Sequence, residues 1–412
     1  MKTPIAVPLY PTLSEIKHFS FENYPEVKQF IQLKQNWCLT HWHWGADFLN
    51  YIGRNKSEHT YVRFRSEVER FLLWLFLFKN KPMGSLRKQD ILEYADFCWK
   101  PPTNWVALSS ADRFIFTNGF FKINPSWRPF RLKGLKNRNK NTQTEKRLYK
   151  PSQETLKANF TAIISFYKFL NNEELCYGNP AQVAKSDCRY FIADSQIKEV
   201  RRLTQAQWEH VLETAENLAN QNPTYERSLF VIASLKVLFL RISELSERKA
   251  WSPCMNHFWQ DEDGNWWLKV FGKGRKLRDI SVPTQFLVYL TRYRQYCGLT
   301  NLPSNSDTAP LVAKTRGVGG MSSRHLTRIV QEIFDAAYES MSSVKGKKAS
   351  DKLLDASSHW LRHTGASMEI ERGRALKDLS EDLGHASMAT TDTVYVQSEH
   401  KKRAESGKDR DV

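Results

Sequence analysis

Apolar residues recur at steps of three and four through most of the first 170 positions. This spacing covers 25–52, the stretch from near Thr60 to Lys81, 85–99, and the stretch from Pro151 to about Leu170. Such spacing puts apolar side chains on one side of a helix. The pattern therefore predicts a series of amphipathic helices, each with one face in a core.

The second half of the chain predicts more helices and one β-hairpin. Helical spacing is expected over 204–219, 224–247, 283–296, 322–341 and a helix that carries His359. Residues 266–271 and 277–282 instead read as two strands that a glycine-flanked turn joins, with Lys273 at its tip. Residues 342–356 have few apolar positions and are expected to form a polar loop.

Shifts in composition suggest where the chain divides. We expect an N-terminal helical extension over 1–54, a helical domain over 55–190 with a basic insertion at 103–150, a polar linker over 191–202, and a second domain over 203–412. The second domain begins at Leu203-Thr204, where the sequence is typical of a capped helix start.

The charge balance points to a polyanionic partner. The chain carries 61 Lys and Arg against 44 Asp and Glu, a formal net charge of +17, which favours nucleic acid. A membrane span is not expected, because the apolar run Phe71–Phe78 is far shorter than the roughly 20 residues that a spanning helix needs. The N-terminal sequence lacks the apolar segment of a signal peptide, which predicts a cytoplasmic, nucleoid-associated protein. Six scattered cysteines without a Cys-x-x-Cys pair predict reduced thiols.

One segment concentrates positive charge. Between Arg131 and Lys150 there are eight basic residues and one acid, Glu145. Such a run is either a solvated loop or a loop that faces DNA phosphates, and the sequence leaves both readings open. The candidate DNA contacts are Lys133, Lys136, Arg138, Lys140, Lys146 and Arg147.

Near the C-terminus, polar groups of three kinds follow one another. His359 and Arg362 are three apart, so on a helix they share a face. Leu383-Gly384-His385 is typical of a helix end from which an imidazole projects. Tyr395 then supplies a phenol. His359 and His363 could imitate a metal pair, but position 360 lacks the glutamate of a His-Glu-x-x-His site and Arg362 would repel a cation. We therefore expect no metal.

An arginine at the end of an apolar run completes the set. Arg241 follows a run that begins at Leu229, and a guanidinium cannot lose its charge on burial, so it needs an anion. A structural ion pair with Glu244 is the simpler alternative. Two arginines with histidines and a tyrosine describe a clamp for a phosphodiester beside a nucleophile.

These motifs, in this order, resemble the tyrosine recombinases of the phage integrase and Xer type. That family has Leu-Arg-x-x-Glu-Leu, a lysine on a β-hairpin, His-x-x-Arg, Leu-Gly-His and a following tyrosine. The chain has the same series over roughly residues 200 to 400, at Arg241, Lys273, His359 with Arg362, His385 and Tyr395. Many members place the tyrosine one position closer to the Leu-Gly-His motif than this chain does.

The resemblance implies a fold and a set of roles. The fold would be mainly α with a small β-sheet or hairpin, as a two-domain C-shaped clamp in which a helical core-binding domain precedes the catalytic domain. Tyr395 would attack DNA, Arg241, Arg362 and His385 would hold the phosphate, and Lys273 would protonate the leaving group. His359 would assist proton transfer, and Glu244 and His363 would support these groups from behind.

The resemblance also implies partners. The expected partners are double-stranded DNA recombination sites, further copies of the chain as a tetramer on two sites, and accessory DNA-bending factors. No cofactor, metal or ATP is expected. The long N-terminal part favours integration or excision of a mobile element. Two alternatives stay open: a DNA-binding regulator on the same fold without catalysis, and an enzyme similar to type IB topoisomerases.

Overall fold

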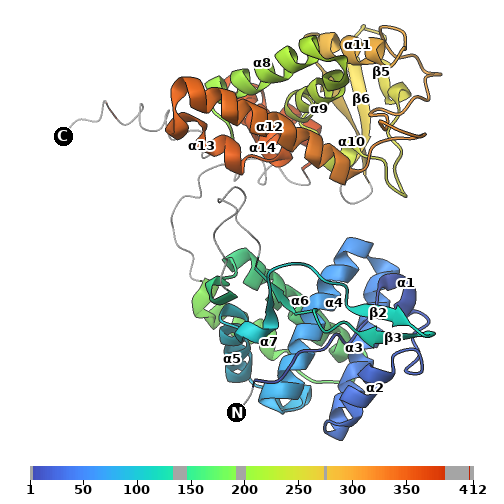
Figure 1. Ribbon diagram of the computed structural model, residues 1–412, viewed down its shortest axis with the longest axis vertical. Helices are drawn as coiled ribbons and strands as arrows, with labels where there is room; N and C mark the ends of the chain where they lie inside the picture. The colour runs from blue at the N-terminus through green and yellow to red at the C-terminus, as the bar shows by residue number, and fades with distance from the viewer. Residues whose placement is uncertain (1–2, 133–145, 192–200, 273–275, 386–407, 409–412) are drawn as a thin grey trace. The chain divides into compact units, whose positions relative to one another are not determined.

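A computed structural model describes residues 3–132, 146–191, 201–272, 276–385 and 408. Within these ranges, the side chains of Arg147 and Lys345 are not described. The chain divides into two compact units, residues 1–195 and 196–412 (Figure 1). Both are mostly helical with small β-sheets, which confirms the predicted mainly α class. The expected linker lies mostly outside the described residues.

Helices build most of the first unit. They are α1 (Leu13–Ile16), α2 (Pro25–Gln32), α3 (Asn36–Asn55), α4 (Glu58–Trp74), α5 (Lys88–Trp99), α6 (Gln153–Asn172) and α7 (Pro180–Asp187). A π-helical turn, Leu75–Lys79, continues α4 before Pro82. The expected single helix over 25–52 is wrong: the chain leaves the helix between α2 and α3, and α3 then runs through Gly53 to Asn55.

The segment 3–12 is bound into the core of this unit rather than set apart from it. The carboxylate of Glu69 on α4 is fully buried and accepts hydrogen bonds from the backbone of Leu9 and Tyr10, at 2.7 and 3.2 Å. Arg113 pairs with the same carboxylate at 3.1 Å. Leu9 and Tyr10 are themselves buried in the hydrophobic core that runs from Ala6 to Cys188.

The expected insertion at 103–150 contains short strands where it is described. β2 (Phe114–Thr117) and β3 (Phe120–Ile123) form an antiparallel hairpin, and β1 (Val106–Ala107) pairs in parallel with β4 (Phe130–Arg131). Asn118 and Gly119 both have positive φ, as a two-residue hairpin turn of type I′ requires. The Phe121 ring stacks on Tyr24 with 4.7 Å between centroids, so aromatic packing attaches the hairpin to the residue that precedes α2.

The second unit packs helices around a three-stranded sheet. The helices are α8 (Gln205–Gln221), α9 (Glu226–Val237), α10 (Ile242–Leu245), α11 (Phe286–Tyr296), α12 (Ser323–Lys345), α13 (Lys347–Asp355), α14 (Ser358–Glu371) and α15 (Leu376–Leu383). The sheet is antiparallel in the order β5 (Phe258–Gln260), β6 (Trp266–Phe271), β7 (Leu277–Val282). The two predicted strands are confirmed with the predicted bounds.

The predicted helix over 224–247 is wrong, and the reason lies in its centre. α9 ends at Val237, and Phe239 adopts a left-handed conformation with φ of 49°. This conformation costs an L-residue roughly 1 kcal/mol, and no glycine or proline marks the break in the sequence. The turn buries Leu240 and places Arg241 directly before α10.

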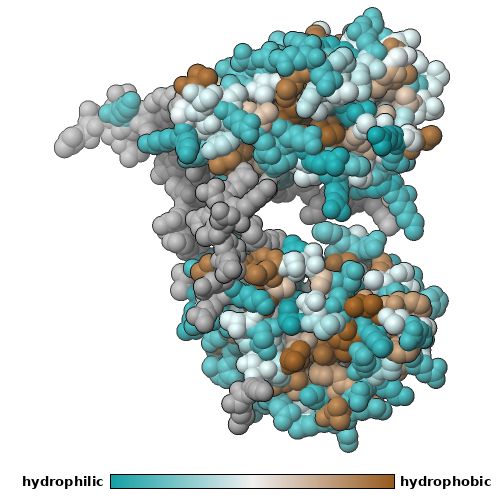
Figure 2. Space-filling view, viewed as in Figure 1, coloured by the Kyte–Doolittle hydropathy of each residue, from teal (hydrophilic) through white to brown (hydrophobic). Residues whose placement is uncertain are grey.

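The predicted polar loop at 342–356 is also wrong. α12 continues to Lys345, Gly346 turns the chain with φ of 79°, and α13 follows. α13 buries only Ser350 and Leu353, three positions apart, so its apolar pattern is too sparse to be seen in the sequence. Figure 2 shows hydrophilic residues over much of the visible face of each unit. In the described part of the chain, every helix is too short or too polar to cross a membrane.

Helices α9 and α14 cross without space for a side chain at Gly365. A Cβ atom there would lie 2.0 Å from the backbone oxygen of Lys236. We therefore expect Gly365→Ala to lower the free energy of unfolding by about 1–3 kcal/mol, because the two helices must separate. Thermal unfolding measures this change. Gly84→Ala is the control, since the nearest atom to its added methyl is 4.0 Å away; an equal loss in both variants would contradict the packing argument.

Candidate active site

Arg362 on α14 is the buried centre of a polar cluster. Its exposed fraction is 1%. One terminal nitrogen donates to the backbone oxygen of Phe239, and the other donates to the backbone oxygen of Leu383 and lies 3.4 Å from Nε2 of His385. The left-handed conformation of Phe239 aims its carbonyl at this guanidinium. Arg362 therefore joins the end of α9 to the end of α15.

Arg241 stands at the start of α10 with Glu244. The Glu244 carboxylate accepts from the Arg241 backbone N–H at 2.8 Å and from Nη1 of the Arg241 side chain at 3.0 Å. The Glu244 side chain is 1% exposed, whereas the Arg241 side chain is 25% exposed. The ion pair with Glu244 thus exists, but it leaves part of the Arg241 side chain accessible.

A second arginine shares Glu244. Arg278 on β7 donates to both carboxylate oxygens of Glu244, at 2.8 and 3.1 Å. Burial by itself would raise the pKa of Glu244, but the hydrogen bonds and charges of Arg278 and Arg241 lower it below its usual value. Glu244 is therefore an anion between two cations, and the three side chains together carry one net positive charge.

Three histidines complete the cluster, and all three have lowered pKa values. Burial lowers the pKa of His385 to about 4, with help from the charges of Arg362 and Arg241. Burial and nearby His359 and Arg362 lower the pKa of His363 to about 4. Burial, Arg362 and Arg241 also lower the pKa of His359. The charges of both arginines therefore reach His359 and His385, and Arg362 is in direct contact with His385 at 3.4 Å.

The lowered pKa of His363 makes stability depend on pH. The unfolded chain takes up a proton at His363 near pH 6.5, whereas the folded chain does so only near pH 4. Between these values the unfolded state binds more protons, so stability falls as the pH is lowered from about 6.5 to 4. We expect His363→Gln to reduce this fall. Thermal midpoints at pH 5 and 7 measure it, and an unchanged pH dependence in the variant would contradict the assignment.

The structure brings most of the predicted catalytic set together. Arg241, Arg362, His359 and His385 cluster with Glu244 and His363, as the distances and shared charge effects above show. Lys273 and Tyr395 lie outside the described residues. Among the predicted DNA contacts, Lys146 is exposed on a short 3₁₀ helix, Lys146–Leu148. The side chain of Arg147 and residues Lys133, Lys136, Arg138 and Lys140 also lie outside the described part.

Sequence reasoning missed two members of this cluster, Arg278 and Phe239. Arg278 had a detectable signal, because alternation along β7 places it on the same face as the buried Ile280 and Val282. Phe239 had none, since a phenylalanine inside an apolar run does not mark a left-handed turn. Across the described residues, no group of His, Cys, Asp and Glu is arranged to hold a metal ion.

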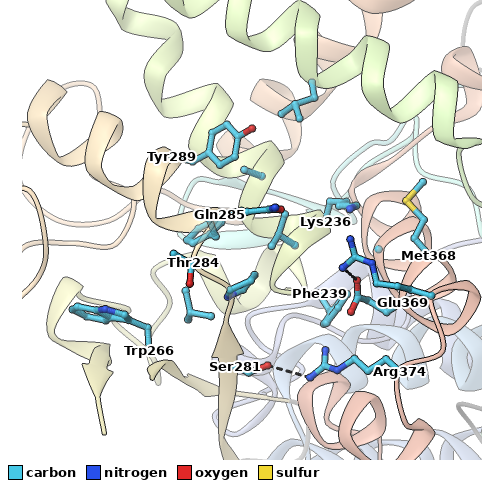
Figure 3. A pocket seen from close by; sticks show the side chains of 18 of the residues that line it. Lys236, Phe239, Trp266, Ser281, Thr284, Gln285, Tyr289, Met368, Glu369 and Arg374 are labelled. Atoms are coloured by element: carbon cyan, nitrogen blue, oxygen red, sulfur yellow. Dashed lines mark hydrogen bonds and ion pairs between the residues drawn. The ribbon is translucent and has the colours of Figure 1, made fainter. Parts of the chain in front are cut away.

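A cavity of about 950 Å³ lies beside the cluster rather than on it. Residues of α8, α9, β6, β7 and α14 line it, among them Lys236, Trp266 and Met368 (Figure 3). Phe239 belongs to its wall, and so does the hydrogen bond between Arg374 and Ser281, at 3.1 Å. None of the predicted catalytic residues that the structure describes lines this cavity, so its volume does not mark the cluster around Arg362.

Comparison with known proteins identifies relatives of this chain. Residues 201–402 match the phage integrase family. The chain is 25% identical over 257 residues to the tyrosine recombinase XerC of Lactobacillus delbrueckii subsp. bulgaricus, an alignment that covers 61% of this chain and 75% of the relative. It is 27% identical over 253 residues to the tyrosine recombinase XerD of Chlorobaculum tepidum, covering 59% of this chain and 72% of the relative.

Solved structures share the fold. The XerH site-specific recombinase bound to a palindromic difH substrate, in a post-cleavage complex, superposes with a TM-score of 0.54 at 15% identity, covering 98% of both chains. The Tn1549 transposon integrase with circular intermediate DNA superposes with a TM-score of 0.53 at 16% identity, covering 90% of this chain and 99% of that one. Residues 201–402 thus form a phage integrase family region, and the relatives and structural neighbours of the chain are tyrosine recombinases.

Proposed function

We propose that this recombinase cleaves and rejoins DNA strands at specific sites through a covalent 3′-phosphotyrosyl intermediate formed by Tyr395. The phenol oxygen attacks a backbone phosphorus, the new bond joins Tyr395 to the 3′ phosphate, and the bond to the 5′ oxygen breaks. Rejoining reverses these steps with another 5′ hydroxyl. Because the phosphotyrosyl bond keeps the energy of the phosphodiester, neither ATP nor a metal is needed.

The observation that carries this proposal is the meeting of Arg241, Arg362 and His385, which come from three separate parts of the second unit. The two guanidiniums would hold the non-bridging phosphate oxygens, where negative charge grows as phosphorus becomes five-coordinate. His385 would add a hydrogen bond to the same oxygens. A phenol has an unperturbed pKa near 10, so it is protonated at neutral pH. A cluster of positive charge beside it favours its ionisation.

The neutral histidines fit a role in proton transfer. With lowered pKa values, His359 and His385 carry no charge near pH 7, so either could accept a proton that a phenol loses. A bound phosphate would raise both pKa values, because an anion favours the protonated imidazole. We assign His359 to this transfer and His385 to the phosphate, with His363 packed at the edge of the His359 ring, 4.5 Å between centroids.

Lys273 is assigned to protonation of the 5′ oxygen. The residues that flank its turn are described, and Gly272 donates to the backbone oxygen of Lys276 at 2.8 Å to close the β6–β7 hairpin. A Cβ atom at Gly272 would lie 3.4 Å from Oε1 of Glu244, so the turn begins beside the arginine cluster. An ammonium group within reach of that cluster would supply the proton that the leaving alkoxide needs.

Trapping the intermediate tests the proposal. In DNA with a nick near the cleavage point, attack releases the short fragment between the two points, which carries the 5′ hydroxyl. Without that hydroxyl religation fails, and the protein stays attached. We expect a covalent adduct at the 3′ end of the broken strand. Sequencing the attached DNA identifies the site, and strand exchange between two such sites separates a recombinase from an enzyme that only relaxes supercoils. Site binding without an adduct would instead support a non-catalytic regulator.

The wider biological assignment is also a proposal. We infer double-stranded recombination sites as the partner, a tetramer on two of them, accessory DNA-bending factors, and a nucleoid-associated location in the cytoplasm. The task would be integration or excision of a mobile element, with the 131–150 basic segment as a phosphate contact. The mass of the complex on paired sites tests the tetramer, and the genomic position of the recovered DNA tests the mobile-element role.

A further inference from the structure

Arg278 occupies a place where an apolar side chain is expected. In the sheet register Val270 pairs with Arg278 and Leu268 with Ile280, so Arg278 shares the face of three buried aliphatic residues. Its side chain is only 12% exposed. A guanidinium in such a position must be paired, because it cannot shed its charge. Its partners therefore indicate why the chain has an arginine there.

The guanidinium connects three elements of the active site. Two of its nitrogens form a fork on the Glu244 carboxylate of α10. Nε donates to the backbone oxygen of Asp382, at 2.9 Å, in the last turn of α15 and three residues before His385. Arg278 thus links three parts of the site: the β6–β7 hairpin, the Arg241–Glu244 pair and the end of α15 that precedes His385.

Two glycines make space for this side chain. A Cβ atom on Gly272 would lie 2.8 Å from Nη1 of Arg278, and one on Gly384 would lie 2.8 Å from its Cδ. Gly384 also has φ of 61°, so both its conformation and its contact exclude a larger residue. The glycine of the Leu-Gly-His motif therefore packs directly against Arg278.

We propose that Arg278 is a positioning residue that keeps Arg241 available to the phosphate. Glu244 is a buried anion, and without Arg278 its neighbouring cation would be Arg241. By taking both carboxylate oxygens in a fork, Arg278 limits Glu244 to one side-chain nitrogen of Arg241. Through the Asp382 carbonyl, the same guanidinium fixes where α15 ends and hence where His385 stands. This inference rests on the proposed cleavage chemistry and adds a residue to it.

The test is a double-mutant cycle read as the rate of covalent adduct formation on nicked DNA. Arg278→Gln should slow the reaction roughly a hundredfold, because Glu244 then draws Arg241 away from the phosphate. The double variant, Arg278→Gln with Glu244→Gln, also lacks the carboxylate charge. Its rate should be at least about tenfold higher than the rate expected if the two single effects multiplied. Rates that simply multiply would overturn the proposal, since a direct phosphate contact or general loss of structure gives no such coupling.

Two further variants keep the result interpretable. Arg278→Lys retains the charge but not the fork, and we expect it to be slow while its thermal midpoint stays near that of the parent; a fully active Lys variant would overturn the proposal even if the Gln variant does not fold. Arg292→Gln breaks a comparable pair with Glu226, 2.6 Å, away from the cluster and should react normally. If the parent protein forms no adduct, the proposed function fails; if it does and Arg278→Gln reacts equally fast, only this inference fails.

Discussion

Replacing Tyr395 with phenylalanine is expected to abolish the covalent adduct altogether while leaving DNA binding unchanged. The substitution removes one oxygen atom, and that atom is the one that bonds to phosphorus in the proposed reaction. The rate should fall to the background of the assay, because no other tyrosine follows His385 in the sequence to replace it. Denaturing electrophoresis of protein with labelled nicked DNA measures the adduct directly.

A matched tyrosine variant controls for this experiment. Tyr177 is 86% exposed in the first unit, so Tyr177→Phe makes the same chemical change without touching the proposed site and should form adduct at the parental rate. Equilibrium binding of both variants to the same DNA shows whether affinity is preserved. Adduct formation by Tyr395→Phe would remove Tyr395 as the nucleophile, and peptide mapping of that adduct would then identify the residue that attacks.

Arg362→Lys should reduce the cleavage rate by a factor of roughly a hundred to a thousand. Loss of a donor that stabilises the transition state costs on the order of 3–4 kcal/mol, and a lysine keeps the charge but cannot reproduce the planar fork. The substitution also weakens the bonds to the Phe239 and Leu383 carbonyls, so some loss of stability is expected as well. Single-turnover adduct formation, at a temperature where the variant is folded, separates the two effects.

The control for this variant lies at the end of the same helix. Arg372 follows α14, is 75% exposed along its side chain and pairs with Glu369 at 3.0 Å. An exposed pair of this kind contributes little to stability, so Arg372→Lys should react and unfold like the parent. If Arg362→Lys were as fast as Arg372→Lys, Arg362 would be a structural arginine only, and the proposed phosphate site would lose its central member.

Motifs with strong local chemistry were predictable from the sequence. The strands of the β6–β7 hairpin were found with correct bounds, because alternation and a glycine-flanked turn depend on neighbouring residues only. The helix end at Gly384 follows from the same kind of signal, since its positive φ favours glycine. Arg241 and Glu244 are three positions apart, so their contact also follows from local geometry.

What failed depended on distant parts of the chain. The turn at Phe239 is stabilised by Arg362, more than a hundred positions later, and no local residue type signals it. α13 depends on packing of Ser350 and Leu353 against the unit and on a hydrogen bond from the Gln207 side chain to the Ala349 backbone. Arg278 was overlooked because its partners, Glu244 and Asp382, come from two other segments. Tertiary contacts decided each of these cases, as expected where intrinsic preference is weak.

The buried Glu69 has a practical consequence for anyone who trims this protein to a shorter version. Cutting the chain before Leu13 would remove the two backbone N–H donors of Leu9 and Tyr10 from the Glu69 carboxylate. Glu69 would keep its pair with Arg113 but would become exposed to solvent. A shortened protein that starts at a later helix would then carry a defect in its first unit unrelated to DNA chemistry. A cut that spares residues 3–12 avoids confusing the two.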